Sequence, residues 1–123
     1  ADWNTLENYL IANGYNYDGS TSGNKIGKSL ASTVYWMTDT STGSVANDVS
    51  KNNKSGFNGL PSGYRYDGNG LSYALGSCAV WLSKDTYFEY ISAEKSMSAT
   101  FVDAIPSNSA YKHYGFAIRC IKD

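Results

Sequence analysis

The stretch that most constrains the fold is SGFNGLPSGYRYDGNG, residues 55–70, which holds one of the two prolines and five of the 12 glycines. Glycine permits positive φ angles and proline fixes its own φ, so this run predicts a series of ordered turns and not a flexible linker. Four of its side chains are apolar enough to hold the turns against a core: Phe57, Leu60, Tyr64 and Tyr66. We therefore expect residues 55–70 to be a scaffold, with recognition further along the chain.

Length and charge limit what the chain can be. At 123 residues it is expected to form a single domain over residues 1–123, because two separate cores would each be too small. The formal net charge is -1 and 17% of the residues are charged, so we expect neither nucleic acid nor an anionic membrane as a partner. No apolar run approaches the roughly 20 residues that span a bilayer, and no signal peptide opens the chain at Ala1. A soluble domain without direct membrane insertion is the expectation.

The first half of the chain predicts helices and loops. Asp2 can cap a helix that the pair Asn13-Gly14 ends. The apolar positions of this helix recur at helical spacing, at Trp3, Leu6, Tyr9 and Leu10. Residues 15–24 favour a loop, and residues 25–31 favour a second, short helix. Residues 38–54 are polar and turn-rich, which predicts a long surface loop with few buried residues that is a candidate for ligand contact.

The second half of the chain predicts an antiparallel sheet, because apolar residues there alternate with period two. The expected strands are residues 71–75, 78–83, 87–92, 98–102 and 116–121. Both faces of the last strand are apolar, so we expect it to be central in the sheet. The dipeptides Asp67-Gly68 and Asn69-Gly70 indicate a hairpin turn before the first of these strands.

Motifs for catalysis and cofactor binding are lacking. His113 is the only histidine, so any histidine-dependent triad would need it, and its neighbours indicate a strand. The sequence contains no HExxH, P-loop, GxSxG or dinucleotide fingerprint, and its carboxylates are scattered singly. We expect no enzyme, no cofactor and no metal site.

Cys78 and Cys120 are the only cysteines, and no CxxC motif or Cys/His cluster surrounds them. The expected use is one disulfide in an oxidising compartment, and the alternative is two free buried thiols. Arg119 lies on a strand predicted to be covered, which favours a structural ion pair or a hydrogen bond to a loop carbonyl over a ligand clamp.

What remains is recognition by tyrosines, of which the chain has 11. Tyrosine offers a large amphipathic contact at low entropic cost, and the abundant serine, glycine and asparagine adapt to a ligand. The alternative is that the sheet simply uses tyrosine. Charged groups accompany tyrosines in TYFEY and SAYKHY, and a face built from them could stack on a sugar or anchor a protein. The candidate ligand-binding residues are Tyr87, Glu89, Tyr90, Tyr111 and His113.

Four segments in order, DWNTLENYL, SGFNGLPSGYR, the strand around Trp81-Leu82-Ser83 and GFAIRCIKD, resemble the Fibrobacter succinogenes major paralogous domain. The resemblance covers nearly the whole chain. It implies a C-type lectin-like α+β fold, with one or two N-terminal helices, long loops and a C-terminal antiparallel sheet. It also implies a secreted or cell-surface bacterial module that binds or has a structural role. It further implies that variable ligand contacts, if present, are to be expected on residues 84–114.

This chain departs from the family pattern in three ways. The family's CPxGWHxPT segment would precede Ala1, so an N-terminal strand and the usual partner of Cys120 are expected to be absent from residues 1–123. Cys78 stands in the tryptophan strand and could replace that partner. The EPN, QPD and WND motifs of calcium-dependent lectins are absent, so calcium-dependent sugar binding is not implied.

The leading hypothesis is an extracellular or cell-surface, non-catalytic module that binds a glycan or protein through its tyrosine-rich C-terminal half. The alternatives are an assembly module of a bacterial surface protein and a variable binding protein diversified by a retroelement. An enzyme using paired cysteines, an activity that related folds host, ranks third. The oligomeric state is not indicated.

Overall fold

The computed structural model describes residues 2–103 and 108–118, and within these the side chains of residues 84–87 and 108–109 are left undescribed. The helices in chain order are α1 (Asp2–Ala12), α2 (Gly27–Leu30) and the 3-10 helix η1 (Val49–Lys51). The strands are β1 (Tyr64–Arg65), β2 (Ser72–Tyr73), β3 (Cys78–Phe88), β4 (Ile91–Ser98) and β5 (Asn108–Tyr111). Strands β1 and β2 form one sheet, and β3, β4 and β5 form a second in that order. All of these strand pairs are antiparallel, so the fold is α+β as the sequence predicted.

Helix α1 forms where the sequence predicts it and ends before Gly14, whose φ of 73° suits a residue without a Cβ. Leu10 is buried, while Trp3 and Leu6 pack partly buried against the same core. Tyr9 was expected on this face, but it is 59% exposed because it lies at the edge of the apolar stripe. None of the helices in the described part of the chain is long and apolar enough to cross a membrane.

The longest element is the β3–β4 hairpin, which corrects two predicted strands. Phe88 pairs with Ile91, so Glu89 and Tyr90 form the turn inside the strand expected at residues 87–92. This turn lacks the Asn-Gly or Asp-Gly signal that marks many two-residue hairpin loops. Strand β4 ends at Ser98, where a strand was expected to begin. Residues 116–118 form no strand, and residues 119–121 of the predicted central strand lie outside the described residues.

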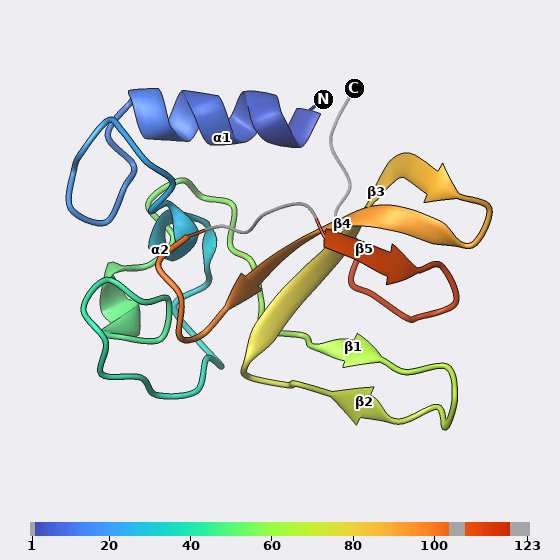
Figure 1. Cartoon of the computed structure of the whole chain (residues 1–123). Coiled ribbons are helices and arrows are strands. Elements are labelled where there is room, and N and C mark those ends of the chain that lie inside the picture. The colour runs from blue at the N-terminus through green and yellow to red at the C-terminus, as the bar shows by residue number, and fades with distance from the viewer. Residues whose placement is uncertain (1, 104–107, 119–123) are drawn as a thin grey trace.

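The three-stranded sheet has two different faces because side chains alternate along its strands. Trp81 and Met97 belong to one face, and both join the buried core that contains residues of α1. Val80 and Glu94 belong to the other face, together with Ser96. Figure 1 shows the sheet lying between α1 and the β1–β2 hairpin.

Aromatic rings fill the face toward α1. Trp3, Phe57 and Trp81, here called the tryptophan cluster, lie with ring centroids 5.4–5.8 Å apart. Beside them the Lys95 ammonium lies 2.7 Å from the Glu7 carboxylate, with side chains only 11% and 16% exposed. The helix is thus held to the sheet by apolar packing and by one largely desolvated ion pair.

The segment expected to be a long surface loop, residues 38–54, is instead partly buried. Residues 43–46 are buried, and the Val45 side chain is fully so. The Val45 N–H donates to the Phe101 carbonyl over 3.0 Å, and the Lys28 ammonium donates to backbone carbonyls including that of Ser44. Backbone groups of residues 38–54 are buried because they form hydrogen bonds with other segments, so the polar composition of these residues does not indicate that they are exposed.

Residues 55–70 behave largely as the predicted scaffold. Phe57 packs in the tryptophan cluster, whereas Leu60 is 46% exposed and does not anchor the segment. Gly63 has a φ of +61° and its N–H donates to the Cys78 carbonyl over 2.8 Å, which ties the segment to β3. The predicted hairpin turn joins β1 to β2.

Candidate functional site

The structure brings together three of the five predicted ligand-binding residues. The Tyr111 and His113 rings stack 5.8 Å apart at 14°, and the Tyr90 ring lies 6.4 Å from that of His113. All three are exposed to solvent. Glu89 is exposed in the β3–β4 turn, and the side chain of Tyr87 lies outside the described part of the structure.

These residues form the edge of a larger group of rings that the sequence did not predict. Its centre is Tyr64 of β1, whose ring stacks on Tyr114 at 6.0 Å and 8° and on Tyr73 of β2 at 6.0 Å and 25°. The Tyr66 ring meets Tyr114 edge-on at 5.3 Å. We call the connected rings the tyrosine cluster: Tyr64, Tyr66, Tyr73, Tyr90, Tyr111, His113, Tyr114 and Phe116.

Polar contacts orient the exposed edge of the tyrosine cluster. The His113 Nδ1 atom lies 3.1 Å from Asp67 Oδ2, which joins the C-terminal segment to the β1–β2 turn. Burial, with smaller contributions from Tyr66 and Asp67, raises the pKa of Tyr114. Like any tyrosine at neutral pH, Tyr114 keeps its phenol protonated and can donate a hydrogen bond.

A cavity of about 560 Å³ opens between the tyrosine cluster and the outer face of the three-stranded sheet. Aromatic rings form one wall, from Tyr64, Tyr111, Tyr114 and Phe116. The opposite wall comes from the outer face of β3 and β4, with Cys78, Val80, Glu94, Ser96 and Ser98. Cavities of this volume with mostly apolar walls and a few polar groups are typical of small-molecule sites.

Glu94 is the central polar group of this cavity. It sits on the middle strand, where it pairs with Leu82 of β3 and Asn108 of β5. Burial raises the pKa of its carboxyl group. Among the residues that the structure describes, none donates a hydrogen bond to this carboxylate or forms an ion pair with it. Asp103 adds a second carboxylate to the cavity lining.

Cys78 also lines the cavity, as a half-buried free thiol. Burial raises the pKa of this thiol, and the nearby Glu94 charge raises it further. A thiol with a raised pKa is a poor nucleophile at neutral pH. Cys120, the other half of the expected disulfide, lies outside the described residues, so the disulfide has no support from the structure and stays a prediction.

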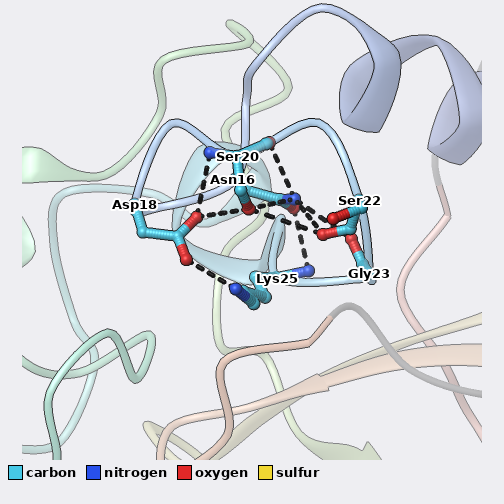
Figure 2. Close-up of polar contacts among 6 residues, drawn as sticks. All are labelled: Asn16, Asp18, Ser20, Ser22, Gly23 and Lys25. Carbon is cyan, nitrogen blue, oxygen red and sulfur yellow. Dashed lines mark hydrogen bonds and ion pairs between the residues drawn. The ribbon is translucent and has the colours of Figure 1, made fainter.

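Away from the cavity, the loop after α1 contains a buried polar side chain, that of Asn16. Asn16 is 3% exposed, and its amide nitrogen lies 2.9–3.1 Å from the carbonyls of Ser20, Ser22 and Gly23. Its Oδ1 atom accepts from the Lys25 N–H over 2.9 Å. In Figure 2 the Asn16 side chain points into the middle of the loop, where these oxygens converge.

Asp18 in the same loop is engaged by residues of the loop itself. Its carboxylate accepts from the Lys25 ammonium at 2.5 Å and from the Ser20 hydroxyl at 2.6 Å. These hydrogen bonds, that of Lys25 above all, hold the pKa of Asp18 well below its usual range. The described residues contain no group of three His, Cys, Asp or Glu side chains placed to hold a metal ion. The arrangement fits a loop held together by its own side chains and does not fit a metal site.

The sequence signal for the missed residues was weak. The position of Tyr64 and Tyr66 in the turn-rich segment predicts a scaffold role; Tyr64 is partly buried, whereas Tyr66 is exposed. Their contact with Tyr114 depends on the bridge between Arg65 and Gly115, which joins distant segments. An acidic residue within an otherwise serine-rich strand, at Glu94, was the one local signal that could have drawn attention to the cavity.

Fold and cavity together define a small α+β domain with an aromatic cavity on the face of its main sheet that lies opposite α1. A model of the Fibrobacter succinogenes major domain matches residues 1–122. The chain therefore belongs to the Fibrobacter succinogenes major domain family, as the sequence resemblance suggested. Searches of curated proteins and of solved structures give no significant match.

Proposed function

We propose that this domain is a non-catalytic recognition module that binds a glycan or a protein through the tyrosine cluster. The observation that carries the proposal is the arrangement of the cluster itself: connected rings around an open cavity on the sheet face that α1 does not cover. Tyr111 is 51% exposed although it stacks on its neighbours. Rings that are held in place yet exposed lose little entropy on binding, which suits them to stack on a sugar or to anchor a protein.

The proposal includes the C-type lectin-like fold and an extracellular or cell-surface location. A helix packed on an antiparallel sheet, with long ordered loops between them, is consistent with that fold. Tyr90, Tyr111, His113 and Tyr114 of the cluster also fall within residues 84–114, where the family resemblance places ligand contacts. Tyr64, Tyr66 and Tyr73 extend the proposed surface to the β1–β2 hairpin.

Labelled protein on a glycan array tests the glycan form of the proposal, and pull-down from an extracellular fraction tests the protein form. The variant Tyr111→Ala with Tyr114→Ala is expected to lose the binding that the wild type shows. Tyr9→Ala is the matched control, because Tyr9 is 59% exposed on α1 and lies outside the cluster. Binding that survives in the double variant, with normal folding by circular dichroism, would contradict the proposed surface.

A further inference from the structure

We propose that the cavity between the tyrosine cluster and the sheet binds an alkylammonium group, which lies against the aromatic wall and faces Glu94. This inference rests on the proposed function and deepens it, because it names the chemistry that the recognised ligand must present. The evidence is the composition of the two cavity walls, one aromatic and one formed by the sheet, and the position of the Glu94 carboxylate in the lining.

The aromatic wall suits a cation. The faces of aromatic rings carry partial negative charge and attract ammonium groups, most strongly where water is excluded. Tyr64 and Tyr114 are stacked nearly parallel and are both partly buried, so their orientation is fixed before any ligand arrives. Phe116 continues the same wall, with its ring centroid 6.1 Å from that of Tyr114.

The sheet wall supplies the opposite charge. Glu94 projects from the middle strand into the cavity lining, and no described residue neutralises it. Lys95, the next residue in β4, belongs to the opposite face and is already paired with Glu7. Asp103 places a second carboxylate in the lining, and the described lining residues include no lysine or arginine. A partly desolvated carboxylate without a counter-charge is stabilised by a bound cation.

The rest of the lining suits the hydrocarbon part of such a ligand. Val80 and Ala110 are apolar, and Ser96 and Ser98 offer hydroxyl groups at intervals of two residues along β4. An alkyl chain or the methyl groups of a quaternary ammonium can lie against the apolar residues while the charge stays near Glu94. A neutral ligand of the same shape would make the same apolar contacts without compensating the carboxylate.

Isothermal titration calorimetry at low ionic strength tests this inference with two molecules of the same shape, choline and its neutral isostere 3,3-dimethylbutan-1-ol. We expect choline to bind at least about tenfold more tightly. Glu94→Gln is expected to remove most of that preference, leaving the part that the aromatic wall contributes, while the affinity for the alcohol stays unchanged. Tyr114→Leu is expected to weaken choline binding by about fivefold. Asp2→Asn, which removes an exposed carboxylate from α1, outside the cavity lining, is the matched control and is expected to bind choline as the wild type does.

A second titration identifies the source of the ammonium group. Nα-acetyl-lysine methylamide presents a primary ammonium, and choline presents a quaternary one. Binding of either compound that depends on Glu94 supports the proposal. Tighter binding of the lysine derivative indicates a protein side chain, and tighter binding of choline indicates a choline-type ligand. Equal affinity for choline and its isostere, unchanged choline affinity in a folded Glu94→Gln variant, or no binding of either cation would overturn the cation proposal. Those results would leave the recognition surface standing, because that surface fails only if Tyr111→Ala with Tyr114→Ala keeps its ligand.

Discussion

The tryptophan cluster and the tyrosine cluster occupy opposite faces of one three-stranded sheet, and they differ in what covers them. Trp81 faces α1 and is 7% exposed, whereas Tyr111 faces solvent and is 51% exposed. The charged groups differ in the same way, because Glu7 is paired with Lys95 on the covered face and Glu94 has no described partner on the open one. The covered face thus pairs its charged groups within the core, and the open face retains the Glu94 carboxylate without a described partner.

Trp81→Ala should separate the two faces most clearly. Removing a buried tryptophan that packs on Trp3 and Phe57 is expected to lower the free energy of unfolding by about 4 kcal/mol. Tyr114→Ala, its counterpart in the tyrosine cluster, should cost only about 1 kcal/mol because much of that ring pair stays accessible to water. Urea denaturation measures both losses of stability. Circular dichroism follows the unfolding of both variants, and tryptophan fluorescence also follows that of Tyr114→Ala. Equal losses would mean that the tyrosine cluster is also core.

Gly63→Ala tests the link between the two faces. A Cβ at Gly63 would lie 2.0 Å from the Tyr73 carbonyl oxygen, and its φ of +61° disfavours any L side chain. Strain and overlap together are expected to cost about 3 kcal/mol. Gly56→Ala is the control, since its φ is +77° with no atom within 4 Å of the added Cβ, and it should cost only about 1 kcal/mol. Thermal unfolding measures both, and similar melting temperatures would contradict the role of the overlap.

Glu7→Gln leaves the Lys95 ammonium in a largely buried place with a neutral partner. The expected loss is about 2 kcal/mol, below that of a fully buried pair because both side chains keep some solvent contact. Replacing both residues, as Glu7→Leu with Lys95→Met, should recover most of that loss because no charge then remains buried. If the double variant is less stable than Glu7→Gln, the attraction between Glu7 and Lys95 must exceed the cost of removing both charges from water. Guanidinium-free urea titration is the appropriate measurement, since salt would screen the pair.

Glu94→Gln should increase the free energy of unfolding at neutral pH, whereas the other variants lower it, and its effect should be the smallest of the four. The folded-state pKa of Glu94 is raised, so its ionisation destabilises the fold at neutral pH, and stability is regained as pH falls through that pKa. The variant should therefore be more stable than the wild type at pH 7, and the difference should disappear below about pH 4, where the unfolded chain's carboxyl is also protonated. Melting temperatures across this pH range check the sign. A loss of stability at pH 7 would show that the carboxylate has a stabilising partner.

Local signals predicted the elements that depend on local chemistry. Asn13-Gly14 marked the end of α1, and the glycine pairs of residues 67–70 marked the β1–β2 turn. The turn at Glu89 and Tyr90 has no such residues, so the sequence predicts a continuous strand where the structure has a hairpin turn. Residues 43–46 are buried through hydrogen bonds to residues 99–101, and a polar sequence gives no sign of that contact.

The site was predicted in part for the same reason. Tyr90, Tyr111 and His113 lie close together in sequence or across adjacent strands, and the structure does bring their rings together. Tyr64 and Glu94 belong to the cavity only because β1 and β4 converge on the C-terminal segment. Proximity of that kind depends on the tertiary fold and not on residue type.

The ion pair between α1 and β4 also bears on the order in which the chain folds. Glu7 and Lys95 are 88 positions apart, so α1 cannot dock until most of the chain has been made. A helix of 11 residues is too short to be stable alone in water, and contacts that close long loops slow folding. Helix α1, although it precedes every other element of this domain, is therefore expected to be among the last to become structured.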